Sequence, residues 1–355
     1  MCNHDPLHCF VPPYILEHMT QSPHRRVSQC AIANLAGGSA FLASRLTAQA
    51  TPGLLPVQPG PGGRHRLIYD AEGTPRLPGR LARSEGQPDS GDPAVDEAYD
   101  GSGLVHDFYD KLFARDSLDG QGMALVSTVH VGEVDLQGDA VPLNNAYWNG
   151  RQMAYGDGDG EVFRRFTGSL EVIGHELNHG LQSFTSNLTY QGQSGALNEH
   201  FADVFGILVR HWHEGTPARE ASWLVGRELL VPATTRRGIR DMEQPGQAYR
   251  QDPDLGDDPQ PAHMSDLYTG PRDRGGVHIN SGIPNRAFVL VAKALGGNAW
   301  DEAGRIWYDT LLQLPADSQF LDCARLSIEI AGRKPYGPAA RKAVAAAWSE
   351  VGILV

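Results

Sequence analysis

The sequence predicts an α+β fold with two lobes, because strand-like segments come first along the chain and helix-like segments follow. Between residues 66 and 168, apolar and polar residues alternate in several short stretches, as half-buried strands require. From Leu170 onward, apolar residues recur mostly at helical spacing. Strands grouped before helices indicate a mixed α/β N-terminal lobe and a mainly helical C-terminal lobe.

The composition fits a globular protein and disfavours two kinds of partner. Of the 355 residues, 41% are hydrophobic and 20% are charged, which are ordinary fractions for a chain long enough to form two cores. The net charge of −12 disfavours nucleic acid as a partner. No run of 18 apolar residues exists, so neither a membrane-spanning helix nor a membrane partner is expected.

The first residues lack the features of a signal peptide. They carry His, Asp and paired prolines where a signal peptide has a long apolar stretch. Export by the general secretory route is therefore not supported. An unconventional export route and a cytoplasmic location are both left open.

Residues 1–50 look like a separate unit that is joined to the rest by a linker. Apolar residues recur at helical spacing in "VSQCAIANLAGGSAFLASRLTAQ", and "VPPYIL" (11–16) is expected to be extended because of its prolines. Residues 51–65 are rich in Pro and Gly and are expected to form an exposed linker open to proteases. The N-terminal lobe is then expected at 66–168 and the C-terminal lobe at 169–355.

Local signals place the individual elements. Asp92 and Pro93 favour a helix start, so a helix is expected over 92–117. Strands are expected in "HRLIYDAEG", "MALVSTVHVGEVD" and "NNAYWNGRQMAYGDGDG". In the C-terminal lobe, helices are expected at 169–184, 195–213, 220–229, 282–296, 299–313, 318–333 and 338–351.

The cysteines are concentrated at the start of the chain. Cys2, Cys9 and Cys30 lie in the first 30 residues, and Cys323 lies near the end. Loss of the leader would leave one thiol, so no intrachain disulfide is expected to stabilise the remainder. Cys2 and Cys9, with the two histidines between them, have the donor types of a small metal site. Unpaired residues on a mobile terminus are the favoured interpretation.

The segment "LEVIGHELNHGLQSF" places two imidazoles and a carboxylate within five residues. On a helix, residues four apart share a face, so His175 and His179 can present two nitrogen atoms to one Zn²⁺ ion. Glu176 lies about 100° round the helix from His175, where it can reach a water molecule on the metal rather than the metal itself. This arrangement is typical of a general base beside a metal. An exposed helix turn with three polar residues is the alternative.

A third ligand is available on the next helical segment, in "SGALNEHFADVFG". Two helices joined by a short loop can pack antiparallel and bring Glu199 over the histidine pair. Asp203 shares a helix face with Glu199 and can accept the other N–H group of His175, which fixes the tautomer. A solvated helix face is the alternative for both carboxylates.

Several motifs in order resemble the thermolysin family of zinc metallopeptidases. These are "GHELNHG", "GALNEHFADVFG" and "DRGGVHINSGIPNRAF", and "NNAYWNGRQMAYGDGDG" resembles the substrate-binding strand of that family. The likeness runs from about Ala94 to the C-terminus, and the "PPYIL" leader resembles the protealysin branch. It implies a two-lobed zincin fold with the zinc helix at the floor of the cleft between the lobes. It also implies a secreted-type neutral zinc endopeptidase, made as a precursor, that cuts peptides before Leu, Phe, Ile or Val.

The resemblance also implies the residues that carry the reaction. One catalytic zinc ion would be held by His175, His179 and Glu199, and Asp203 would support the first of them. Glu176 would be the general base.

Two further groups of residues complete the implied site. The oxyanion would be stabilised by His278 and Tyr190, with Asp273 orienting His278. The extended peptide would be held by Asn145, by the backbone of Ala146, and by Arg240, which would bind the carbonyl beyond the scissile bond.

The chain departs from the family pattern where thermolysin has a double calcium site. The matching positions hold Glu171, Arg210, Ser222, Leu224 and Arg227, of which only the first is acidic. Because calcium needs oxygen ligands, no double calcium site is expected, and Arg210 is expected to pair with Glu171 instead. Calcium elsewhere is left open.

The leader is expected to regulate the enzyme. The resemblance implies that residues 1–50 block the cleft as an intramolecular inhibitor until a cut near 45–63 removes them. A thiolate from Cys2 or Cys9 on the zinc is a less favoured alternative. We expect a monomer that acts on peptide or protein substrates.

Two other functions are alternatives to a zinc endopeptidase. A non-catalytic zinc protein that binds peptides or partners would not need Glu176, His278 and Tyr190 together. A structural zinc protein usually supplies four ligands, often cysteines, whereas this chain offers three ligands and no cysteine among them.

Overall fold

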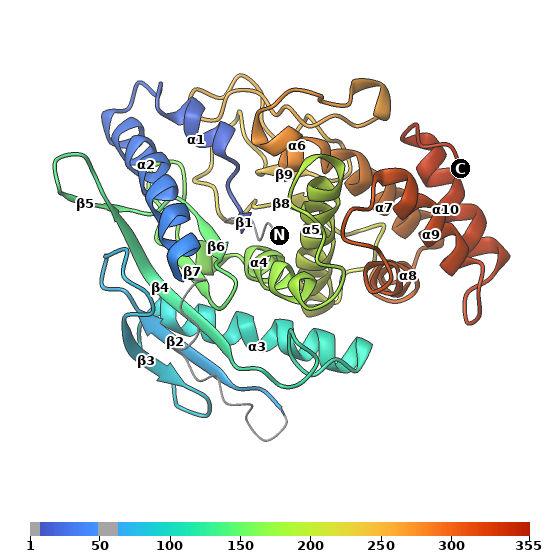
Figure 1. Cartoon of the computed structure of the whole chain (residues 1–355), viewed down its shortest axis with the longest axis horizontal. Helices are drawn as coiled ribbons and strands as arrows, with labels where there is room; N and C mark the ends of the chain where they lie inside the picture. The colour runs from blue at the N-terminus through green and yellow to red at the C-terminus, as the bar shows by residue number, and fades with distance from the viewer. Residues whose placement is uncertain (1–7, 49–62) are drawn as a thin grey trace.

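The structure, a computed structural model, describes residues 8–48 and 63–355 and has two lobes (Figure 1). The N-terminal lobe is built on a mixed sheet and the C-terminal lobe is helical, which confirms the predicted fold class. Within the described residues, seven strands form this sheet in the order β1-β6-β7-β4-β2-β3, with β5 paired to β4. The strands are β1 (His8–Cys9), β2 (Arg66–Asp70), β3 (Arg80–Ser84), β4 (Leu125–Val134), β5 (Ala140–Pro142), β6 (Ala146–Trp148) and β7 (Met153–Gly156).

Helix α3 (Pro93–Phe113) belongs to the N-terminal lobe and packs against strands β2 and β4 of the sheet. It begins as predicted, because the side chain of Asp92 accepts hydrogen bonds from the N–H groups of Ala94 and Val95 and Pro93 occupies the first turn. It ends at Phe113 because Ala114 adopts a left-handed conformation. The prediction of a helix over 92–117 is therefore confirmed apart from its last turn.

The C-terminal lobe contains most of the helices in the part of the chain that the structure describes. They are α4 (Leu170–Ser183), α5 (Gly192–Glu214), α6 (Asp273–Asn280), α7 (Gly282–Leu295), α8 (Glu302–Leu311), α9 (Phe320–Ala331) and α10 (Pro338–Glu350). Two short strands, β8 (Leu224–Val225) and β9 (Arg240–Asp241), pair antiparallel between α5 and α6, and 3₁₀ turns occur at Phe166–Gly168 and Met264–Asp266.

The helix expected at 220–229 is wrong. Leu224 and Val225 form β8 instead, and Gly226 follows with a φ of +73°, which no right-handed helix allows. The apolar residues there follow the pairing with β9 rather than a helix face. Conversely, α6 was not predicted, because two adjacent glycines interrupt the helical pattern of the sequence. In the structure Gly275 and Gly276 have left-handed φ values of 81° and 83° within this helix.

The leader, defined from here on as the described residues 8–48, adds one edge strand and two helices to the fold. They are β1, α1 (Pro13–Met19) and α2 (Arg25–Ala48), and β1 pairs antiparallel with β6 (Figure 1). The expectation that 11–16 is extended is wrong from Pro13 onward, because Pro13 takes the first position of α1, where a proline needs no donor. The strand instead ends at Cys9, and the backbone bends at Phe10 and Val11 before Pro12, which is extended.

Helix α4 lies between the two lobes. It packs against α5 on one side and against α3 and β6 on the other. The two helices approach closely where Gly174 faces Gly206, since a Cβ on Gly206 would lie 2.5 Å from the carbonyl oxygen of Glu171. This approach lets side chains of α5 reach those of α4.

No helix among the described residues is long and apolar enough to cross a membrane. Three expectations fall wholly or partly outside the described residues. These are residues 51–62 of the expected linker (51–65), residues 49–62 of the expected cut region (45–63), and the donors Cys2 and His4 of the alternative metal site.

Candidate metal and active site

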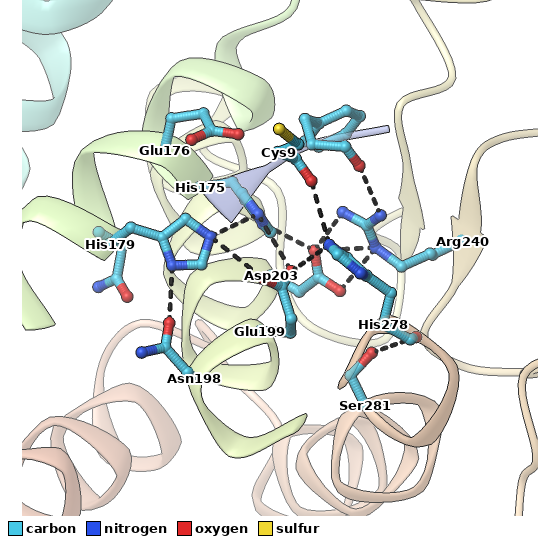
Figure 2. Close-up of polar contacts among 12 residues, drawn as sticks. Cys9, His175, Glu176, His179, Asn198, Glu199, Asp203, Arg240, His278 and Ser281 are labelled. Atoms are coloured by element: carbon cyan, nitrogen blue, oxygen red, sulfur yellow. Dashed lines mark hydrogen bonds and ion pairs between the residues drawn. The ribbon is translucent and has the colours of Figure 1, made fainter. Parts of the chain in front are cut away.

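Three predicted zinc ligands meet at the packed faces of α4 and α5. Ligand atoms of His175, His179 and Glu199 all lie within 4.8 Å of one another, and all three residues are buried. The histidines come from successive turns of α4 and the glutamate comes from α5 (Figure 2). The helix pairing that the sequence predicted therefore brings the three together.

The hydrogen bonds of the two histidines direct their other nitrogen atoms at one point. Nδ1 of His175 lies 2.9 Å from a carboxylate oxygen of Asp203, and Nδ1 of His179 lies 2.8 Å from the side-chain oxygen of Asn198 (Figure 2). Because both partners accept, each Nδ1 carries the proton and each Nε2 presents a lone pair. The two Nε2 atoms lie 3.0 Å apart.

The arrangement fits a divalent cation. Two facing lone pairs repel each other, and the buried Oε2 atom of Glu199 has no hydrogen-bond partner among the described residues. Two imidazole nitrogens and one carboxylate oxygen are the ligand set of a catalytic zinc with an open fourth position.

Glu176 lies beside this ligand set but is tied to the sheet. One of its carboxylate oxygens accepts a hydrogen bond of 2.9 Å from the N–H group of Trp148 on β6, and the other has no partner among the described residues. Burial, followed by the charge of Glu199, raises the pKa of Glu176 well above its usual value, although the N–H groups of Trp148 and Phe10 oppose the shift. A buried carboxylate with one free oxygen can accept a proton.

His278 and Tyr190 lie beside Glu199 and contact each other. Tyr190 donates a hydrogen bond to Glu199, and its hydroxyl lies 3.2 Å from Nε2 of His278. Nδ1 of His278 lies 2.7 Å from a carboxylate oxygen of Asp273. Burial alone would lower the pKa of His278, but the charges of Glu199 and Asp273 outweigh it and raise the pKa to about 9. His278 is therefore a double donor at neutral pH.

Arg240 forms a bidentate ion pair with Asp203, the same carboxylate that holds His175. Its Nε and Nη2 atoms lie 2.9 Å and 2.8 Å from the two carboxylate oxygens. Burial would raise the pKa of Asp203, but Arg240 and His175 lower it far below its usual value. One carboxylate therefore fixes both a candidate ligand and a candidate substrate-binding residue.

The leader contacts two of the residues that the sequence predicts to hold a peptide. Asn145 exchanges two hydrogen bonds with the backbone of Val11, at 2.9 Å and 3.1 Å. The backbone carbonyl of Ala146 accepts a 3.1 Å hydrogen bond from Phe10, whose side chain is fully buried. The ring of Phe10 lies 5.2 Å from that of His175.

Sequence reasoning missed the residues that act only through long-range contacts. Asn198 orients His179, and Asn285 donates a 2.9 Å hydrogen bond to Asp203. Asn198 directly precedes Glu199, which could have suggested a contact within the site. Asn285 lies 82 residues from Asp203 and carries no local signal.

The other end of the α4–α5 pair holds a buried ion pair. Nη1 of Arg210 lies 3.1 Å from the carboxylate of Glu171, which confirms the predicted pairing. The same guanidinium donates to the backbone carbonyls of Ser222 and Leu224, at 2.7 Å and 3.2 Å. At this end of the helix pair, the guanidinium of Arg210 therefore binds one carboxylate and two backbone carbonyl oxygens.

Comparison with known protein families gives two adjacent matches that together cover most of the chain. Residues 73–183 match the thermolysin metallopeptidase catalytic domain, and residues 186–353 match the thermolysin metallopeptidase alpha-helical domain.

Individual relatives agree with these matches. The chain is 44% identical over 352 residues to an extracellular metalloprotease of Pectobacterium carotovorum, covering 99% of this chain and 97% of that protein. It is 51% identical over 295 residues to protease PrtS of a Photorhabdus species, covering 82% and 77%. The solved precursor of protealysin, a metalloproteinase from Serratia proteamaculans, has a TM-score of 0.86 and 43% identity and covers 98% of this chain and 99% of that chain.

Proposed function

The chain belongs to the thermolysin metallopeptidase family and is a zinc metalloendopeptidase in precursor form, and from this premise we propose how its residues hydrolyse a peptide bond. His175, His179 and Glu199 would hold the zinc ion. When bound, zinc lowers the pKa of a coordinated water and polarises the peptide carbonyl. The observation that carries the proposal is the buried pair of Nε2 atoms 3.0 Å apart, next to the Oε2 atom of Glu199, which makes no hydrogen bond with the described residues.

The other residues would move a proton and stabilise charge. Glu176 takes the proton from water on its free oxygen and passes it to the leaving amine. His278 and Tyr190 donate to the carbonyl oxygen as it becomes negative, and Asp273 keeps His278 protonated and aligned. Arg240, Asn145 and Ala146 hold the backbone of the substrate beyond the scissile bond.

The test compares casein hydrolysis by the wild-type protein and by Glu176→Gln, after residues 1–50 are removed. The variant should retain its zinc and lose roughly 10²–10⁴-fold in kcat, because it loses only the general base. Chelation of the metal should abolish the wild-type activity. Zinc in both proteins with casein or short peptides cut by neither would instead favour a non-catalytic zinc protein.

We further propose that residues 1–50 inhibit the enzyme and that peptides are cut before a hydrophobic residue. The supporting observation is the leader strand beside β6, with Phe10 buried against His175. N-terminal sequencing of the active form checks the proposed cut near 45–63. An active form that still contains residues 8–48 would disprove inhibition by this segment.

For the remaining features we propose one catalytic zinc ion, a monomer, and lobes divided at 66–168 and 169–355. The guanidinium of Arg210 supports the absence of a double calcium site, since it occupies the carbonyl oxygens and the carboxylate there. The name of the Pectobacterium relative supports an extracellular location. Metal analysis tests the zinc ion and the absence of a double calcium site, light scattering tests the monomer, and fractionation of the culture tests the location.

A further inference from the structure

The leader passes through the site with its backbone groups paired one after another. The carbonyl oxygen of Cys9 lies 3.1 Å from Nε2 of His278 (Figure 2). The N–H group of Phe10 donates to the carbonyl of Ala146 at 3.1 Å, and the carbonyl of Phe10 accepts a 3.0 Å hydrogen bond from Arg240. The next residue, Val11, is held at both its N–H and its carbonyl by Asn145, so no backbone group from the Cys9 carbonyl onward is skipped.

This pairing fixes the register of the leader against the reacting groups. His278 is the donor for the carbonyl that is attacked, and Arg240 is the donor for the carbonyl one residue further on. The leader offers the carbonyl of Cys9 to the first and the carbonyl of Phe10 to the second. The bond that lies at the reacting position is therefore the one between Cys9 and Phe10.

Groups on both sides of that bond match the needs of hydrolysis. The N–H group of Phe10 donates to Ala146 and Glu176 accepts from the N–H group of Trp148, so the leaving nitrogen and the residue that would protonate it are both held by the three-residue strand β6. The side chain of Phe10 is fully buried between the ring of His175 and the guanidinium of Arg240, whose centre lies 4.7 Å from the phenyl ring. A bond held in this way has its carbonyl oxygen and its leaving nitrogen positioned by the groups that would act on a substrate.

We propose that the zinc-loaded precursor cuts its own leader between Cys9 and Phe10, before any cut in the region 45–63. The inference rests on the proposed function and adds a processing site to it. Water supplies a hydroxyl group to the carbonyl carbon of Cys9 and a proton, carried by Glu176, to the nitrogen of Phe10 as the C–N bond breaks. The products are a carboxylate at Cys9 and an amine at Phe10.

The cut leaves the enzyme latent, because the anchors of the leader lie after Phe10. Ile15, Met19 and Val27 are fully buried against the rest of the core. Ser22 donates a buried hydrogen bond of 2.6 Å to Asp254. Before Phe10, the described leader contributes the two-residue pairing of β1 with β6 and the contact of the Cys9 carbonyl with His278, which is the carbonyl that the cut converts to a carboxylate. The shortened leader therefore still fills the position of a substrate.

The experiment follows the intact mass and the N-terminus of the full chain after zinc is added to metal-free protein. The expected result is a form that begins at Phe10, arises at a rate unchanged by dilution, and does not digest casein. Glu176→Gln should not form it. Phe10→Gly should form it roughly 10- to 100-fold more slowly, because the buried aromatic side chain is lost.

A second readout does not depend on turnover. Hydrogen exchange of residues 8–16 in the metal-free Glu176→Gln chain should be slow, and Phe10→Gly in that background should speed it. Cys9→Ala is the matched control for thiol chemistry and should be cut as the wild type is. Loss of the cut in Cys9→Ala, or rapid exchange of residues 8–16, would overturn the register.

The outcomes separate the two proposals. If the bond between Cys9 and Phe10 survives while the same preparation, freed of its leader by an added protease, digests casein, the inference fails and the proposed function stands. If casein is also left intact after the leader is removed, the proposed function fails and the inference fails with it.

Discussion

The two ends of the α4–α5 helix pair bury carboxylates in different ways. At one end Glu171 faces Arg210, and the guanidinium also takes two backbone carbonyl oxygens. At the other end Glu199 faces two imidazole nitrogens, and its Oε2 atom makes no hydrogen bond with the described residues, since Nε2 of His175 and of His278 both lie 3.5 Å away. Burying a carboxylate is costly unless a cation or donors compensate it. The first end therefore carries its own cation, and the second depends on a cation from solution.

The largest expected effect is that of removing the metal. Stripping zinc should abolish activity and lower the free energy of unfolding by about 4 kcal/mol or more, compared with protein in zinc at about 1,000 times its Kd. Added calcium should leave the unfolding midpoint almost unchanged, because Arg210 already holds the oxygen atoms at its end of the pair. Calorimetry of the metal-free protein with each ion measures both effects. A stabilisation by calcium as large as that by zinc would break the comparison.

Replacing the internal cation should cost nearly as much. Arg210→Met leaves Glu171 buried and unpaired, which should lower the free energy of unfolding by about 3–5 kcal/mol. Zinc content and the kcat of the folded fraction should be unchanged, because the guanidinium does not touch the ligands. Denaturant unfolding and metal analysis measure these quantities.

The matched control for this substitution neutralises the carboxylate as well. Glu171→Gln in the Arg210→Met background should recover part of the lost stability, since the unpaired charge is gone. No recovery would mean that the backbone carbonyls of Ser222 and Leu224, rather than Glu171, are the main partners of Arg210.

A smaller effect should come from loosening one zinc ligand. Asn198→Ala removes the acceptor that orients His179 and should weaken zinc binding by roughly 10- to 100-fold. Asn178→Ala is a matched control, because this buried asparagine on α4 bonds Tyr109 rather than a ligand. It should lower stability but leave the Kd for zinc unchanged. Competition with a fluorescent chelator gives both constants, and equal losses would show that Asn198 acts only through general stability.

The smallest effect concerns His130, whose positive charge is lost at high pH. His130 lies between Asp157 and Asp92, at 2.8 Å and 3.0 Å, and hydrogen bonding to Asp157 raises its pKa to about 9 although burial opposes this. Because the folded-state pKa is above the unfolded value of about 6.5, the stabilisation is complete below that pH and is lost as the pH rises through 9.

His130→Asn tests this third arrangement and keeps a residue that tolerates the local φ of 53°. It should lower the free energy of unfolding by about 1–2 kcal/mol at pH 6, after allowance for partly exposed partners, and by much less at pH 10. Denaturant unfolding at both pH values checks this. A loss that is independent of pH would assign the effect to packing.

Much of the site could be predicted because its signals are local. The spacing of His175 and His179 follows from the helix period, and the motif around Glu199 follows within one short loop. The close approach at Gly174 and Gly206 sets how far α5 lies from α4, yet nothing in either segment indicates which glycines meet. Asn285 reaches Asp203 only because α7 packs against α5, and no local feature of the sequence predicts this contact.

The errors in the fold have the same origin. The segment 220–229 has apolar residues at a spacing that suits a helix, but pairing with β9 and the left-handed Gly226 decide its conformation. In the leader, the prolines do restrict the backbone, but Pro13 begins α1 instead of extending the strand. Proline fixes φ near a value that both conformations share, so the neighbours decide between them.

Arg210 also determines how the stability of this protein responds to its surroundings. A bound ion contributes according to its free concentration, so a protein that relies on one weakens as the medium is depleted. The guanidinium of Arg210 belongs to the same chain as Glu171, so its effective concentration is fixed by the covalent connection. It cannot be diluted, displaced by a competitor or removed by a chelator. At this end of the helix pair, stability therefore does not depend on the concentration of any ion in the medium, but it does depend on the ion pair between Arg210 and Glu171.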